Sequence, residues 1–158
     1  MRRTHARAPR GQPAYAVEPY KLEEKVNLLS ALSLNGVIAP YLICNGSVDT
    51  DILLYYAENI LCPELRAGDI LVLDNYPIHK SYKLKALVEQ RGASIRFLLT
   101  YSPDFNPIEL AFSKLKAHLK KLAASTLDTL SLGIKQTFDA IALHEIIAWF
   151  RHCGYVVP

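Results

Sequence analysis

The sequence predicts a mixed α/β domain in which short strands are flanked by helices. Three observations support this prediction: a hairpin pattern near the start, short apolar strands that alternate with helical patterns in the middle, and only helical patterns towards the end. The chain has 158 residues, of which 51% are hydrophobic, and this is enough for one domain with a buried core. We expect a basic arm over residues 1–20 and the folded domain over residues 21–158.

The arm is expected to be irregular and extended, because several prolines and a glycine interrupt any regular element there. Basic side chains crowd the same segment, at Arg2, Arg3, Arg7 and Arg10. An arm of this composition either lies along the phosphate backbone of a nucleic acid or is a loose solvated tail.

An antiparallel hairpin is expected next. Residues 25–34 form an apolar run of strand length, Asn35-Gly36 is a strong turn signal, and residues 37–44 form the returning strand. Pro40 lies within the returning strand. Because proline has no N–H to donate, it indicates a strand at the edge of a sheet or a β-bulge.

A helix and a short strand follow the hairpin. Asp49 can cap a helix over residues 50–61, where apolar side chains recur at helical spacing before a proline and a glycine end it. Residues 70–74 then form a short apolar strand, of the kind that lies in the buried centre of a sheet flanked by helices. This strand ends at Asp74, and in open α/β sheets functional sites form at the carboxyl ends of strands.

The second half of the chain is predicted to be mostly helical. Ser81 can cap a helix that Gly92 ends, and residues 94–99 form a further strand. Asn106 is expected to cap the next helix, with Pro107 at its first helical position. That helix has one apolar stripe, formed by Ile108, Phe112, Leu115, Leu119 and Leu122. Two further helices are predicted, one capped by Thr126 and one over residues 143–153.

Composition excludes several classes of protein. The cysteines Cys44, Cys62 and Cys153 are widely spaced and form no CxxC pair, which argues against a zinc site and a disulfide framework and fits a reducing cytoplasm. No apolar run approaches the ~18 residues that span a bilayer, so no membrane partner is expected. The net charge of +3 is mild, but the basic residues cluster, which suits a polyanion as well as a solvated surface.

Asp74 is the first candidate functional residue. A buried carboxylate without a partner is costly, so an acid at the end of a buried strand needs a cation, a helix N-terminus or a metal ion. The alternative is a turn residue, because Asp74 and Asn75 open an Asp-Asn-Tyr-Pro sequence with good turn chemistry. His79 can orient a water molecule or a phosphate, or it is an ordinary surface residue, and Lys80 beside it can contact a phosphate.

Glu109 is the second candidate. Asn106 and Glu109 have the spacing of a capping box, so a purely structural role at a helix N-terminus is one interpretation. The other interpretation is a metal ligand. Helical spacing places Glu109 on one face with Ser113, Lys116 and Lys120, where the carboxylate can hold a metal ion and the lysines a phosphate backbone.

Two acidic residues with no cluster of Cys or His nearby favour Mg²⁺ or Mn²⁺ over zinc. We therefore expect Asp74 and Glu109 to meet around shared ions, although residues 75–108 lie between them. Two such ions, ~3.5–4 Å apart, can activate the attacking oxygen and stabilise the leaving oxygen of a phosphodiester.

Two stretches carry a resemblance to a known family. Residues 73–80 (LDNYPIHK) and 101–109 (YSPDFNPIE) resemble the second Asp and the Glu of DDE transposases, in the bacterial insertion-sequence branch of the Tc/mariner superfamily. Residues 7–12 and 150–155 are also similar to that branch, so the resemblance covers nearly the whole chain. It implies an RNase H-like (retroviral-integrase-like) fold in which three carboxylates bind two divalent ions. It also implies a reaction in which water cuts a DNA strand and the 3′ hydroxyl is joined to a target.

The first Asp of that family has no counterpart here. The resemblance places it on the first strand, shortly before the Arg-rich loop, and this sequence begins inside that loop. The helix-turn-helix region that recognises the element's ends has no counterpart either. We therefore expect a truncated catalytic domain that lacks its first strand. It would be the downstream frame of a split transposase, inactive until an upstream product is joined to it by frameshifting.

Three functions compete at this point. The first is an enzyme fragment that acts on transposon ends and target DNA in the bacterial cytoplasm, at the nucleoid. The second is a non-catalytic DNA-binding or dimerising remnant that keeps the basic arm and the lysine-bearing helix. The third is an unrelated α/β module whose acids are only caps and turns, and it predicts no metal-dependent change in melting temperature. A homodimer or an upstream product is the expected protein partner, because a missing strand leaves a sheet edge open to pairing.

Overall fold

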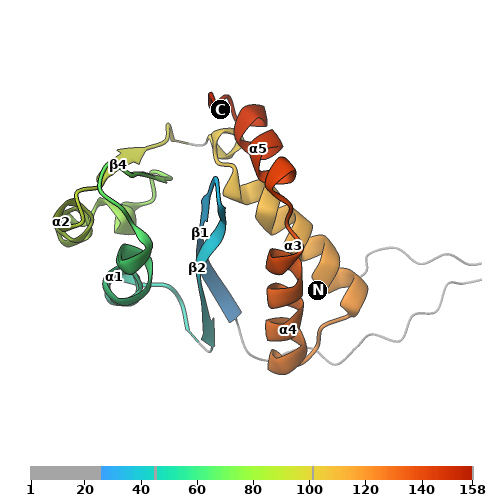
Figure 1. The fold of residues 1–158 in the computed structure, drawn as a ribbon. Helices are drawn as coiled ribbons and strands as arrows, with labels where there is room; N and C mark the ends of the chain where they lie inside the picture. The colour runs from blue at the N-terminus through green and yellow to red at the C-terminus, as the bar shows by residue number, and fades with distance from the viewer. Residues whose placement is uncertain (1–25, 45, 101, 158) are drawn as a thin grey trace, which may run out of the picture. The chain divides into compact units, whose positions relative to one another are not determined.

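The structure, a computed structural model, describes residues 26–44, 46–100 and 102–157 (Figure 1). Its elements follow the predicted order of hairpin, helix, strand, helix, strand and then helices. The predicted basic arm over residues 1–20 lies outside the described residues, and with it Arg2, Arg3, Arg7 and Arg10.

The described residues fall into two compact units, and each is considered by itself. The larger unit contains the strands and residues 142–157, and the smaller unit contains residues 111–141. Both candidate acids, Asp74 and Glu109, belong to the larger unit. No helix in the described ranges has the length and the apolar character that crossing a bilayer requires.

The hairpin forms as predicted, with its turn one residue earlier. Strands β1 (Val26–Ser33) and β2 (Gly36–Cys44) pair antiparallel, and Ser33 lies opposite Gly36, so Leu34 and Asn35 form the turn (Figure 1). Gly36 has a φ of 143°, which a residue with a Cβ rarely adopts. The glycine therefore acts as the first residue of the returning strand, and this is why the turn is shifted.

Pro40 lies at a β-bulge, one of the two settings that the sequence indicates for it. The pairing passes from Leu29 opposite Tyr41 to Ala31 opposite Ile38, and Ala39 adopts a φ of 51°. Side chains satisfy the carbonyl groups around the bulge. The buried Tyr56 hydroxyl donates to the Ala39 oxygen at 2.9 Å, and the Ser30 hydroxyl donates to the Ile38 oxygen at 3.0 Å.

The first helical segment changes its hydrogen bonding along its length. Asp49 caps α1 (Thr50–Tyr56) as predicted, because its carboxylate accepts the Ile52 N–H at 2.9 Å. The chain continues as the π-helical turn η1 (Ala57–Leu61) and then the 3₁₀ turn η2 (Cys62–Glu64). The predicted end of the helix near Leu61 is therefore the point where one kind of helical turn gives way to another.

Strand β3 (Ile70–Leu73), helix α2 (Tyr82–Gln90) and strand β4 (Ser94–Phe97) form a parallel crossover unit. Gly92 ends the helix with a φ of 72°, as predicted. Ser81 occupies the N-cap position, but its side chain accepts no capping hydrogen bond. Strand β3, which leads to Asp74, is thus part of a short β-α-β unit.

The prediction that β3 is a buried central strand is wrong within the described residues. These residues form two separate two-stranded sheets, β1 with β2 and β3 with β4, so β3 is an edge strand. Ile70 is 60% exposed although it is a large apolar residue. Among the described residues β3 pairs with β4 alone, so the backbone groups of its other edge have no ladder partner there.

The two sheets nevertheless share one hydrophobic core. Leu84 and Val88 of α2 are almost completely buried, and they pack in one cluster with Tyr56, Ala57 and Leu61 from the first helical segment. Leu29 and Ile38 of the hairpin and Leu71, Leu73 and Ile95 of the parallel pair pack against this cluster. The end of β3, where Asp74 lies, is therefore anchored by the main core of the larger unit.

The helices of the second half are α3 (Ile108–Leu122), α4 (Leu127–Asp139) and α5 (Leu143–His152). Thr126 caps α4 as predicted, since its hydroxyl accepts the Thr129 N–H at 3.2 Å. Gly133 lets α4 approach α3 closely, because a Cβ there would lie 2.7 Å from a methyl group of Leu119. The apolar stripe predicted for α3 is thus partly used within the smaller unit.

Candidate metal centre

Asp74 is the first residue after β3, at the carboxyl end of a parallel strand. Its carboxylate oxygen Oδ1 accepts the N–H of Tyr76 at 3.2 Å, so the residue does take part in a turn, as one interpretation of the sequence proposed. The side chain is nevertheless 60% exposed. An exposed carboxylate at a strand end is open to a ligand, which a buried turn residue is not.

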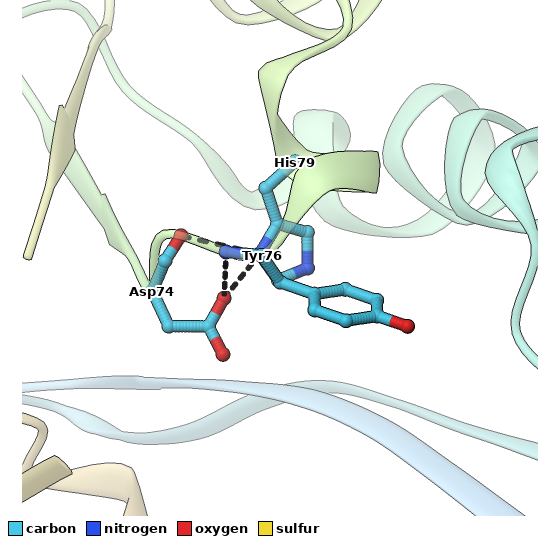
Figure 2. Close-up of polar contacts among 3 residues, drawn as sticks. All are labelled: Asp74, Tyr76 and His79. Carbon is cyan, nitrogen blue, oxygen red and sulfur yellow. Dashed lines mark hydrogen bonds and ion pairs between the residues drawn. The ribbon is translucent and has the colours of Figure 1, made fainter. Parts of the chain in front are cut away.

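His79 contacts the same carboxylate oxygen (Figure 2). The 3₁₀ turn η3 (Pro77–Lys80) folds back towards the strand end and places His79 Nδ1 2.6 Å from Asp74 Oδ1 and 3.4 Å from the Asp74 carbonyl oxygen. An ionised carboxylate can only accept, so this contact requires the proton on Nδ1. Oδ1 therefore has two partners, while Oδ2 has none within the described residues.

Asn75 links the ends of the two parallel strands. Its side-chain amide donates to the hydroxyl of Thr100 at 3.1 Å, and the Leu98 N–H donates to the Leu73 oxygen at 2.8 Å just before it. Thr100 was not among the residues predicted from the sequence. Its signal was the parallel register: Leu73 lies opposite Phe97, so residues just beyond the two strands end up side by side.

Glu109 is the second residue of α3 and is exposed. The capping-box interpretation requires the backbone N–H of Asn106 to bond to the Glu109 carboxylate, but that N–H donates to the Pro103 oxygen at 2.9 Å instead. Among the described residues the Glu109 carboxylate has no hydrogen-bonding partner, so it is available to a ligand.

The Asn106 side chain does not cap this helix among the described residues, contrary to the prediction. Helix α3 begins at Ile108, one residue after Pro107, and the Asn106 side chain makes no hydrogen bond to the first turn within the described part of the chain. Instead the backbone oxygen of Asn106 accepts the Glu109 N–H at 3.1 Å. Asn106 also ends the preceding 3₁₀ turn η4 (Pro103–Phe105), because its own N–H donates to the Pro103 oxygen.

The C-terminal segment contacts the turn that leads to Glu109. The hydroxyl of Tyr155 donates to the Phe105 oxygen at 3.0 Å, and its ring meets Phe150 edge to face. Burial raises the pKa of the Tyr155 hydroxyl. Burial, reinforced by the nearby Asp104 carboxylate, raises the pKa of the Cys153 thiol. The sequence alone did not reveal this contact between segments that lie far apart in the chain.

The candidate phosphate-binding lysines are all exposed. Lys80 ends η3, five positions beyond Asn75, and Lys116 and Lys120 lie on α3 with Glu109 and Ser113 on one exposed helical face. The structure thus brings Asp74, Asn75 and His79 together at the end of β3. It places Lys116 and Lys120 in the smaller unit and the two acids in the larger one.

The donor set suits a hard divalent cation but is incomplete. Two carboxylates with uncommitted oxygens match the oxygen ligands that Mg²⁺ and Mn²⁺ prefer. Within the described ranges, however, no group of three or more His, Cys, Asp or Glu residues could hold a metal ion. A cation held by Asp74 and Glu109 therefore needs at least one further ligand.

The chain matches a known protein family over most of its length. The sequence profile described as DDE superfamily endonuclease matches residues 1–131. A comparison with curated protein sequences gives no significant match.

Several solved structures have the same fold as this chain. The pre-cleavage Mos1 transpososome aligns with a TM-score of 0.76 and 18% identity, over 96% of this chain and 47% of that chain. The Mos1 mariner paired end complex with Mn gives 0.74 and 20%, over 96% and 49%. The Mos1 transposase catalytic domain with raltegravir and Mg gives 0.70 and 17%, over 85% and 75%. The expected RNase H-like α/β fold is thereby confirmed, and the chain spans about half the length of the first two Mos1 chains.

Proposed function

Because the chain belongs to the DDE superfamily of endonucleases, we propose that it is the downstream part of a Tc/mariner-type transposase catalytic domain, of the bacterial insertion-sequence branch. The proposed activity is cleavage of a DNA strand and transfer of that strand to a target. One observation carries this proposal: Asp74 presents an uncommitted carboxylate oxygen at the end of a parallel strand, while Glu109, in the same compact unit, is released from its capping role.

Asp74 and Glu109 are the proposed metal ligands. Mg²⁺ or Mn²⁺, when bound there, would activate the attacking oxygen and stabilise the leaving oxygen of the phosphodiester. Asp74 offers Oδ2, because Oδ1 is taken by Tyr76 and His79. The hydrogen bond from Asn75 to Thr100 joins the segment after β3 to the segment after β4. It thereby helps to fix the position of the loop that carries Asp74. Asn106 accepts the Glu109 N–H and so fixes the start of the helix that carries the second ligand.

The third carboxylate is proposed to come from a further segment that pairs with the open edge of β3. Two observations support this: β3 has a partner on one side only among the described residues, and its Ile70 is exposed. A strand added at that edge would end near Asp74 and would bury the apolar side chain. An upstream-frame product is the proposed source, and a second copy of the chain is the alternative source. We therefore infer that the chain alone cuts DNA poorly.

DNA is the proposed partner, both as transposon ends and as target. Lys80, Lys116 and Lys120 are exposed and suit a phosphate backbone, and the proposal extends to the four arginines of the basic arm. The Mos1 structures named as a transpososome, a paired end complex and a strand transfer complex support this assignment by likeness of fold. The proposed location is the bacterial cytoplasm, at the nucleoid.

A nicking assay tests the proposal. The chain would be joined to the polypeptide encoded immediately upstream, and supercoiled DNA would be incubated with it in Mn²⁺. We expect nicking that Glu109→Gln and Asp74→Asn each abolish, while salt-sensitive DNA binding stays within about twofold of the unmodified protein, because neither acid contacts phosphate without the metal. Full nicking by both variants would refute the proposed metal centre.

The competing proposal is a non-catalytic DNA-binding or dimerising remnant. It is favoured by the lack, among the described residues, of any cluster of three metal-binding side chains. It predicts DNA binding with no metal-dependent nicking in any joined form. Nicking that depends on Glu109 excludes it.

A further inference from the structure

We propose that His79 is a positioning residue for Asp74: it holds one carboxylate oxygen so that the other oxygen faces a divalent cation. This inference rests on the proposed metal centre and deepens it. Figure 2 shows the arrangement, in which the imidazole and the Tyr76 backbone approach the same oxygen of the carboxylate.

The hydrogen bond from His79 to Asp74 is not needed to form the turn after β3. The Tyr76 N–H alone closes the turn after Asp74, at 3.2 Å from Oδ1. The contact from His79 Nδ1 to the same oxygen is much shorter, at 2.6 Å, and a second approach of 3.4 Å reaches the Asp74 carbonyl oxygen. His79 Nδ1 therefore contacts both the carboxylate and the backbone carbonyl group of Asp74.

The imidazole is itself held in place. The backbone N–H of His79 donates to the backbone oxygen of Tyr76 at 3.0 Å, and Pro77 restricts the backbone at the start of the same 3₁₀ turn. The ring stacks edge to face on Tyr76, with 6.1 Å between the ring centroids. His79 is only 20% exposed, whereas the Asp74 side chain is 60% exposed. The less exposed residue thus orients the more exposed one.

Fixing the orientation of the Asp74 carboxylate should raise its affinity for a cation. A free surface Asp rotates about two side-chain bonds and must be ordered when it binds a metal ion, which costs affinity. With Oδ1 occupied by two donors, the carboxylate presents Oδ2 in one orientation before any cation arrives. Groups that orient a metal ligand in this way change metal affinity by about 10–100-fold when they are removed.

A stability role predicts something different. The Asp74 carboxylate that accepts this contact is 60% exposed, so loss of the contact should cost only about 0–1 kcal/mol and change the melting temperature little. Metal affinity and melting temperature therefore separate the two roles. The Nδ2 of asparagine lies the same number of bonds from Cα as the Nδ1 of histidine, so Asn is the variant that can restore the donor.

The experiment measures Mn²⁺ affinity by electron paramagnetic resonance of free Mn²⁺. It uses the chain joined to the polypeptide encoded immediately upstream, as in the nicking assay, because the described residues supply an incomplete set of ligands. The unmodified joined protein is compared with four variants. We expect His79→Leu to weaken the affinity about tenfold. His79→Asn should stay within about threefold of the unmodified joined protein, since it keeps a donor at the same place. The control His144→Leu replaces an exposed histidine of α5 and should leave the affinity unchanged. All three should melt within about 2 °C of the unmodified joined protein.

The fourth variant, Asp74→Asn, distinguishes failure of this inference from failure of the proposed function. If Asp74→Asn weakens Mn²⁺ binding but His79→Leu does not, the positioning role is overturned and the metal centre stands. The positioning role is also overturned if His79→Asn binds as weakly as His79→Leu, because a donor at the Nδ1 position would then be irrelevant. If the unmodified joined protein and its Asp74→Asn variant bind Mn²⁺ equally, or neither binds it, both the metal centre and the role of His79 are refuted.

Discussion

Replacement of Tyr56 by phenylalanine should destabilise the protein through one lost hydrogen bond. Tyr56 is 4% exposed, and its hydroxyl donates to the Ala39 oxygen at 2.9 Å, inside the β-bulge of the hairpin. Ala39 is unpaired in the ladder with β1, so Tyr56→Phe leaves a buried carbonyl group without its donor. A buried polar group left without its partner costs about 1–3 kcal/mol.

The expected effect is a loss of about 2 kcal/mol in the free energy of unfolding, or about 4–8 °C in melting temperature for a chain of this size. Urea unfolding followed by far-UV circular dichroism measures it, and the dependence of the free energy on urea should be unchanged because the same surface is exposed. Tyr55→Phe is the matched control, since Tyr55 is the preceding residue of α1 and is 55% exposed. It should change the stability by less than about 0.5 kcal/mol. Equal effects of the two substitutions would show that the bulge carbonyl does not depend on the Tyr56 hydroxyl.

Three further outcomes are expected. Tyr155→Phe should lower nicking by the joined protein several-fold with little change in melting temperature, because it frees the turn before Glu109 while its hydrogen bond is exposed; an unchanged nicking rate would argue against this contact. Thr100→Val should lower Mn²⁺ affinity by loosening the loop of Asp74, and a double-mutant cycle with Asn75→Ala should show coupling; additive effects would mean that the two side chains do not cooperate. Cys62 should react with iodoacetamide more slowly than a free thiol at pH 8, as peptide mass spectrometry would show, because burial is the main cause that raises its pKa. Since the folded-state pKa is the higher one, the stability linked to this thiol is fully present below the unfolded pKa of about 8.5 and is lost as the pH rises above it.

The local elements were predictable because their signals lie within a few residues. Asp49 and Thr126 cap their helices through N–H groups three positions ahead, and Gly92 ends α2 as expected. Pro40 marks the bulge because the missing N–H is a property of the residue itself. Sequence spacing does not decide between a side chain and a nearby backbone group that compete for the same N–H. The oxygen of Pro103 takes the N–H that a capping Glu109 would need, and sequence spacing cannot rank these two acceptors.

The sequence by itself determined which residues are available for chemistry: the acids Asp74 and Glu109, the amide and imidazole beside the first acid, and the basic residues around them. The tertiary structure alone decided how these groups are used. It placed β3 at the edge of the sheet that the described residues form. It also joined Asn75 to Thr100 and Tyr155 to Phe105, contacts that depend on how distant segments fold back. It also assigned His79 to one oxygen of Asp74. The physical reason is that residue type sets what a group can donate or accept, whereas the direction in which it does so is set by the packing of the backbone that carries it.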